Sequence, residues 1–292
     1  MRKLSGLPFT LLVTWCLNAQ NVTISLTDIS FYADVMVHAS KPVHRMRAAT
    51  EFLRLFKDYL NTPESSANTF KDLPWLTVVT PQDSTFRIIT WQVEEDLQTF
   101  RYYGYIQFLS GIDHPPLEFR DTRSLTSEYA SFDQGTWYGA IYYGIQPFKT
   151  QDKTDAYLLL GFNAHTPTIN QRVAEVLILQ SSGATFGSPV FNPTDSTEVK
   201  SRIILEYTDV ASATMRFDRE KELLIYDHVI PITTPEGPAL VPDGSYHGYR
   251  YTNGMWHFID SVFNIIMDEP PGGREPQKEK RDLFGREMKK KD

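Results

Sequence analysis

Two aspartates and three histidines in the last quarter of the chain could carry acid–base or metal chemistry. Asp227 and His228 end a strand-like run, and Asp243, His247 and His257 follow it. A carboxylate beside an imidazole can act as a general acid–base pair or hold a metal ion. A structural alternative is that His228 only bonds to backbone at the strand end. The catalytic candidates are therefore Asp227, His228 and Asp243, and the metal-ligand candidates are His228, His247 and His257.

Aromatic residues gather in two short runs and form a second group of candidates. The runs contain Tyr102, Tyr103, Tyr105, Trp137, Tyr138, Tyr142 and Tyr143. Exposed rings on a sheet can stack on sugars or line an apolar groove. Because side chains alternate along a strand, about half of these rings should instead face the core. The ligand-binding candidates are Tyr103, Tyr105, Tyr138 and Tyr142.

Sequence motifs for the common catalytic and cofactor sites are absent. The chain has no HExxH, GxSxG, P-loop, GxGxxG or EF-hand pattern. We therefore expect no cofactor and a non-catalytic role. An enzyme remains an alternative, because catalytic groups often come together from distant positions in the sequence.

The first twenty residues resemble a secretory signal peptide. Arg2 and Lys3 precede the apolar stretch 7–13, and Ala19 provides a small residue for cleavage. This stretch is shorter than the ~20 residues that a spanning helix needs. We therefore expect an exported mature chain without a transmembrane helix. Its single cysteine, Cys16, would be removed with residues 1–20, leaving no disulfides.

Charge is distributed unevenly and bears on possible partners. Residues 270–292 contain eight Lys or Arg and five Asp or Glu, whereas the rest of the mature chain is acidic. An acidic body repels phosphates, which argues against nucleic acid. The segment 269–292 begins near Pro270-Pro271-Gly272-Gly273 and is predicted to be disordered. Its residues 270–292 could dock on an envelope protein or an anionic surface.

The segment 21–63 is predicted to be helical and to pack on a sheet. Pro42 suits the first turn of a helix over 42–61. An apolar stripe follows, with charged residues on the other faces; it consists of Met46, Ala49, Leu53, Phe56 and Leu60. Residues 28–39 could form a shorter helix or a strand. Residues 64–72 are expected to form a polar connector.

The segment 64–268 is predicted to be an antiparallel β domain. Runs rich in β-branched and aromatic residues alternate with a period of two; they span 73–80, 85–93, 99–109, 117–123, 137–148, 156–163, 172–179, 199–208, 214–218 and 222–230. The absence of long intervening helices excludes βαβ units. The fold class is mainly β (α+β), with a large antiparallel sheet arranged as a sandwich or a partly closed barrel beside an N-terminal amphipathic helix.

Several local signals add detail to this prediction. Residues 218–221 are predicted to join two strands in a tight hairpin, and Pro242-Asp243-Gly244-Ser245 is predicted to form a turn. Gly104 and Gly139 follow tyrosines in similar runs. At such positions a glycine allows an aromatic side chain to pack close to the backbone.

Five stretches resemble an uncharacterised exported protein family of Bacteroidota. They are 86–91, 102–107, 137–143, 226–231 and 242–246. The likeness covers residues 28–265 and implies location without any known activity. The chain lacks a folded C-terminal sorting domain, which favours retention in the periplasm.

A periplasmic binding or scaffolding component of the cell envelope is therefore the leading hypothesis. The alternatives are a hydrolase acting on an envelope polymer and a carrier of a lipid or other apolar ligand. A pocket lined by acids and histidine would favour the hydrolase, a deep apolar cavity the carrier, and a shallow aromatic face a binding module.

Overall fold

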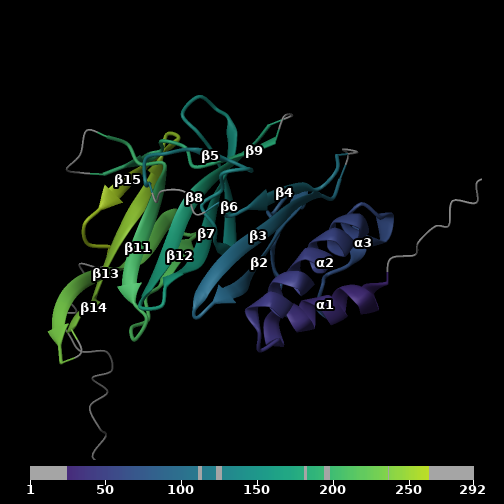
Figure 1. The fold of residues 1–292 in the computed structure, drawn as a ribbon. Coiled ribbons are helices and arrows are strands. Elements are labelled where there is room, and N and C mark those ends of the chain that lie inside the picture. Colours follow the sequence, from purple (N-terminus) through teal and green to yellow (C-terminus); the bar gives the residue numbers. More distant parts are fainter. Residues whose placement is uncertain are drawn as a thin grey trace, which may run out of the picture.

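A helical layer and three stacked β-sheets make up the fold. The computed structural model describes residues 25–110, 114–122, 127–180, 183–193, 198–235 and 237–262. The predicted signal segment 1–20 and tail 269–292 lie outside these residues. The three sheets are open and mainly antiparallel, and the helices cover the outer face of the first sheet (Figure 1). The predicted mainly β fold with an N-terminal helix is confirmed, and of its two forms the structure has the sandwich.

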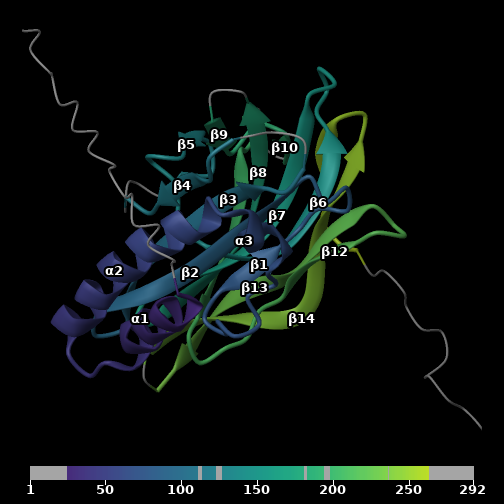
Figure 2. The same cartoon turned by 90° about the vertical axis from the view of Figure 1, so that its right-hand side faces the viewer.

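The helical layer consists of α1 (Leu26–His38), α2 (Pro42–Leu60) and the short α3 (Pro63–Ala67). Helix α1 begins after Ser25, whose side chain accepts a hydrogen bond from the amide of Thr27. Helix α2 begins with Pro42, as predicted. Figure 2 views the molecule from the helix side, with α1 and α2 in front of the first sheet.

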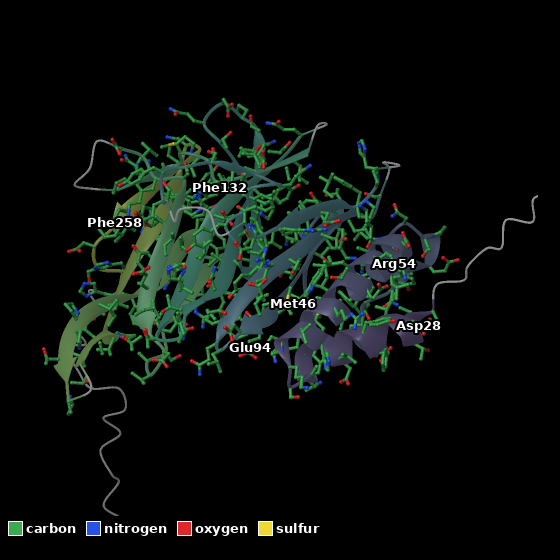
Figure 3. All side chains as sticks on the ribbon, viewed as in Figure 1. Asp28, Met46, Arg54, Glu94, Phe132 and Phe258 are labelled. Carbon is green, nitrogen blue, oxygen red and sulfur yellow. The ribbon has the colours of Figure 1, made fainter. Side chains whose placement is uncertain are left out.

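Two details of the predicted helical segment were wrong. The buried stripe of α2 includes Arg45, while Met46 and Leu53 are only partly buried. Arg45 can be buried because its Nε donates to Glu94 O (2.7 Å) and its Nη1 to Ala39 O (2.9 Å). Figure 3 shows Glu94 at the end of the sheet next to the helices. The segment 64–72 is not simply a polar connector, because it contains most of α3 and the buried ring of Phe70.

Sheet A has the strand order β1-β2-β3-β4 and supports the helices. Its strands are β1 (Thr77–Val79), β2 (Phe86–Asp96), β3 (Thr99–Phe108) and β4 (Leu117–Arg120). Trp91 and Tyr105 are among the side chains that face the helices, where both rings contact Phe56. The opposite face, which includes Phe86 and Ile88, packs on the second sheet.

Sheet B is the central layer, with the order β5-β9-β8-β7-β6 and with β11 also paired to β8. Its strands are β5 (Phe132–Asp133), β6 (Ile141–Lys149), β7 (Asp155–Thr166), β8 (Ile169–Gln180), β9 (Gly183–Phe186) and β11 (Arg202–Thr208). Alternation along β7 sends Leu159 toward sheet A and Leu158 and Leu160 toward sheet C, the third sheet. Both faces of the central sheet are therefore buried.

Sheet C has the order β10-β15-β14-β13-β12. Its strands are β10 (Phe191–Asn192), β12 (Met215–Asp218), β13 (Leu223–Thr234), β14 (Gly237–Thr252) and β15 (Met255–Ile259). The predicted turn at Pro242–Ser245 was wrong, because these residues lie inside β14. There the pairing shifts from Asp227↔Tyr246 to Val229↔Pro242. An irregularity of this kind accommodates Pro242 and the positive φ of Gly244 without reversing the chain.

Gly104 on β3 and Gly254 in the turn between β14 and β15 are both positions where a larger residue would not fit. A Cβ on Gly104 would lie 2.2 Å from the Phe119 ring, so the predicted close approach of an aromatic side chain is confirmed there. Gly254 follows Asn253 in the two-residue turn between β14 and β15, where both residues have positive φ. A Cβ on Gly254 would also lie 2.3 Å from the backbone nitrogen of Gln151.

Gly254→Ala is therefore expected to lower the free energy of unfolding by about 3 kcal/mol or more, from backbone strain and overpacking together. Gly244→Ala is the matched control. Gly244 has the same kind of φ (+90° against +84°), but no atom lies within 4 Å of a Cβ there. We expect this control to cost only about 1–2 kcal/mol. Urea denaturation of both variants measures the difference, and equal losses would contradict the collision with Gln151.

Candidate functional site

The four tyrosines predicted to bind a ligand are all buried. Tyr103 and Tyr105 lie beneath the helices, and Tyr142 lies between sheets A and B. The hydroxyl of Tyr138 donates to the buried Gln171. None of these four rings is more than 8% exposed. The expectation of a binding face formed by them is therefore wrong; they belong to the core.

Asp227 has a structural environment separate from the histidines. Its Oδ2 accepts hydrogen bonds from the amide (2.5 Å) and the hydroxyl (2.9 Å) of Thr214, and its side chain is buried. Thr214 immediately precedes β12. These bonds attach the start of β12 to β13, which accounts for a buried carboxylate at this position.

His228, Asp243 and His247 are brought together by the irregularity in β14. Asp243 Oδ2 lies 2.8 Å from His228 Nδ1, and the rings of His228 and His247 are 4.3 Å apart. Hydrogen bonds from Ser245, and then the one from His228, lower the pKa of Asp243 to about 2. Burial and the neighbouring His228 lower the pKa of His247. The hydrogen bond between His228 and Asp243 can orient the imidazole and keep the carboxylate charged.

His257 does not join this cluster. It pairs with Arg250, three residues beyond His247 on β14, so it lies on the opposite face of sheet C. Ser245 donates to Asp243 (2.7 Å) and lies on the same side of the His228 ring as that aspartate. This differs from a catalytic triad, in which the serine and the aspartate contact different ring nitrogens. Within the described ranges, no group of three or more His, Cys, Asp or Glu side chains could hold a metal ion.

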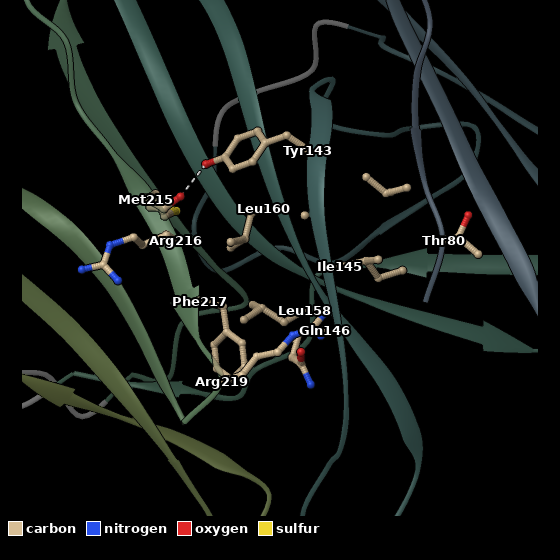
Figure 4. Close-up of a pocket in the computed structure, with 12 residues that line it drawn as sticks. Thr80, Tyr143, Ile145, Gln146, Leu158, Leu160, Met215, Arg216, Phe217 and Arg219 are labelled. Atoms are coloured by element: carbon tan, nitrogen blue, oxygen red, sulfur yellow. Dashed lines mark hydrogen bonds between the residues drawn. The ribbon is translucent and has the colours of Figure 1, made fainter. Parts of the chain in front are cut away.

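A cleft between β6 and β12, which we call the edge cleft, has the features of a binding site (Figure 4). Its volume is about 390 Å³, in the range of small-molecule sites. The apolar part of its lining comes from all three sheets and consists of Val79, Ile145, Leu158, Leu160, Met215 and Phe217. The core between sheets B and C, which contains Leu158 and Met215, therefore opens to the surface here.

The uncharged polar side chains of the same lining are Thr80, Tyr143 and Gln146. The Tyr143 hydroxyl donates to Met215 O (2.9 Å), which joins the edges of β6 and β12. Burial raises the pKa of Tyr143 to about 12, so its hydroxyl stays protonated at neutral pH. The buried Oε1 of Gln146 has no hydrogen-bond partner among the described residues. An unpaired acceptor of this kind carries a desolvation cost that a donor would remove.

The charged side chains of the edge cleft are both arginines. Arg216 and Arg219 are exposed, and neither forms an ion pair with another described residue. In Figure 4, Arg219 extends toward Gln146, whereas Arg216 points away from Leu160 and Tyr143. Arg219 therefore supplies positive charge at an apolar cleft.

Strand β6 is an edge strand with three features that hinder pairing with another strand. Its register shifts between Tyr142 and Gly144, it contains Pro147, and it ends with Lys149. Irregularities, prolines and lysines protect exposed edges from strand addition. The edge cleft is therefore better suited to a small ligand than to an extended peptide.

No protein-family model, curated protein or solved structure matches this chain. The likeness to exported Bacteroidota proteins stays a prediction, and so does docking through residues 270–292. Across the described ranges, no helix has the length and apolar character needed to cross a membrane.

Sequence reasoning missed the residues of the edge cleft. The sequence places Arg219 only in the predicted hairpin turn between β12 and β13, and the structure confirms that turn. Gln146 and Phe217 were read only as strand residues. No motif marks these positions, because the cleft exists only where β6 and β12 come together.

Proposed function

We propose that this chain is a non-catalytic, exported binding protein whose edge cleft takes an amphipathic ligand with an apolar body and an anionic head. The observation that carries the proposal is the combination of an apolar lining with Arg219 as the charged group directed into the cleft. Apolar contact provides affinity, and the guanidinium selects for negative charge. The signal-like residues 1–20 are the reason for placing this role in the periplasm.

The composition of the cleft favours the carrier over the hydrolase. Its described lining contains no Asp, Glu or His, and the raised pKa of Tyr143 keeps that hydroxyl protonated at neutral pH, so it is not available as a general base. The His228–Asp243 pair belongs to sheet C and does not line this cleft. The residues suited to acid–base chemistry are therefore separate from the residues suited to holding a ligand.

Three ligands that share the same type of alkyl tail but carry different head groups test the proposal. We expect the mature chain, residues 21–292, to bind decanoate about tenfold more tightly than decanol, and decyltrimethylammonium most weakly. Isothermal titration calorimetry below the micelle concentration measures the three constants. The preference should fall with added salt, because Arg219 is exposed. Equal affinities for all three heads, or no binding, would contradict the proposal.

Two arginine variants locate the selectivity. Arg219→Gln should remove most of the preference for decanoate and leave the affinity for decanol unchanged. Arg216→Gln is the matched control, because it removes the same charge from a side chain that points away from the cleft. If both variants weaken decanoate binding equally, the effect comes from overall charge and not from the cleft.

A further inference from the structure

A second cleft lies between the helical layer and sheets A and B. Its volume is about 480 Å³, and we call it the helix-side cleft. Its apolar lining includes Val37 at the end of α1, Trp75, Phe100, Ile141 and Phe162. The lining is mostly apolar and comes from α1, from residues 74–77 and from strands β2, β3, β6 and β7. This cleft shares no lining residue with the edge cleft.

Electrostatics distinguish the two clefts. Glu94 is the one charged side chain among the described residues that line the helix-side cleft. Its Oε2 lies 3.6 Å from Arg45 Nη2, and its Oε1 accepts from the amide of Gln98 (3.0 Å). The carboxylate is therefore already paired and leaves no free charge for a ligand. A neutral ligand suits this cleft, whereas an anionic ligand suits the edge cleft.

Gln92 provides the polar feature of the helix-side cleft. It lies on β2 opposite Tyr102, on the face of sheet A that is directed toward sheet B. Its Oε1 is covered by other atoms and accepts no hydrogen bond from any described residue. An unpaired buried acceptor costs about 1–3 kcal/mol. Because the side chain as a whole is only partly buried, rotation of its amide would present this oxygen to the cleft.

We infer that the helix-side cleft binds a compact, neutral, apolar ligand that carries one hydroxyl or N–H donor. The apolar lining takes the body of the ligand, and Gln92 Oε1 accepts the donor. This site is independent of the proposed function of the edge cleft, so either can fail without the other.

Trp75 provides a direct readout for binding. Its side chain is 37% exposed, whereas Trp91, Trp137 and Trp256 are at most 1% exposed. In residues 21–292 an aqueous quencher such as iodide therefore reaches mainly Trp75. A ligand in the helix-side cleft should protect this ring from iodide. Trp75→Phe should remove the quenchable signal and confirm its source.

Borneol and its methyl ether form a matched pair of probes, because the ether lacks the hydroxyl donor. We expect borneol to bind the mature chain about tenfold more tightly than the ether. In Gln92→Leu the two probes should bind equally, and the midpoint of thermal unfolding should be unchanged or higher. Gln146→Leu, which removes the other unpaired glutamine oxygen, is the control and should keep the preference.

Four results would overturn the inference: no protection of Trp75 by either probe, equal binding of both probes to the unmodified chain, a preference for borneol that survives in Gln92→Leu, or displacement of borneol by decanoate. Adding a saturating concentration of decanoate, which is expected to occupy the edge cleft, shows which of the two clefts borneol occupies. Borneol that remains bound supports a separate site, and borneol that is displaced shows that it occupies the edge cleft instead.

Discussion

Replacing Arg202 by methionine is expected to lower the free energy of unfolding by about 3–5 kcal/mol. Arg202 and Glu175 face each other on β11 and β8, with Nε and Oε2 3.1 Å apart. Neither side chain is exposed to solvent. The substitution leaves the carboxylate of Glu175 buried without its counter-charge, which is the costly state for such a pair.

The surroundings of this ion pair increase the expected effect. Glu175 also accepts a hydrogen bond from Tyr142, whose hydroxyl accepts one from Trp137 Nε1 (2.7 Å). Arg202 Nη1 donates to Ala130 O (2.8 Å), and its guanidinium lies 4.4 Å from the ring of Phe132. Removing the guanidinium therefore also removes contacts that hold residues 127–132, which lead into β5, against β11.

The double variant Glu175→Leu/Arg202→Met separates charge from packing. It removes both charges, so we expect it to regain most of the stability lost in Arg202→Met. Lys200→Met is the control, because Lys200 and Glu128 form an ion pair that is partly exposed (23% and 26%) and should contribute less than about 1 kcal/mol. Urea denaturation measures all three variants. If Arg202→Met costs no more than Lys200→Met, the argument from burial is wrong.

Arg87→Met is expected to lower the free energy of unfolding by about 3 kcal/mol or more. The guanidinium donates to Ser65 O (2.7 Å), to Asn68 O and to Gln107 Oε1 (2.9 Å from Nε). Burial lowers the pKa of Arg87 to about 10, which leaves it charged at neutral pH. Its partners are carbonyl oxygens. Methionine would leave several of them buried and unpaired, at about 1–3 kcal/mol each.

Arg87→Lys tests whether the forked geometry matters beyond the charge. Lysine keeps the charge but cannot donate to several fixed oxygens in one plane, so we expect it to restore less than half of the loss. Gln107 Nε2 donates to Leu60 O (2.9 Å), which extends the network to the end of α2. Hydrogen exchange should therefore quicken first in α3 and the last turn of α2. Uniform loss of protection across sheet A would contradict this assignment.

Runs of β-branched and aromatic residues predicted most of the longer strands, including those of the central sheet that is buried on both faces. All ten predicted strand runs overlap a strand, and the predicted helix over 42–61 corresponds to α2 (Pro42–Leu60). Strands β14 and β15 were missed because Pro242 and Gly244 indicate a turn when read locally. Asn253-Gly254 was an available hairpin signal for this pair. Pairing of β14 with both β13 and β15 outweighs the local preference for a turn.

The candidate sites were less predictable than the strands. His228 and Asp243 were both named as candidates, and the irregularity in β14 brings them together. The edge cleft had no local signal, since its lining comes from β6, β7 and β12 and from the end of β1. Arg219 in a turn looks like an ordinary solvated residue until the edge of another sheet lies beside it.

Periodicity and composition by themselves determined an antiparallel β protein with a helical N-terminal part, because β-branched and aromatic runs favour strands and an apolar stripe at helical spacing favours a helix. The tertiary structure alone decided which polar side chains are buried. Charged side chains such as Arg45, Arg87, Glu175 and Arg202 are generally expected at the surface, since burying a charge requires partners that satisfy it. Those partners lie far along the chain, as Glu175 and Arg202 do, and only the stacked sheets bring them within hydrogen-bonding distance.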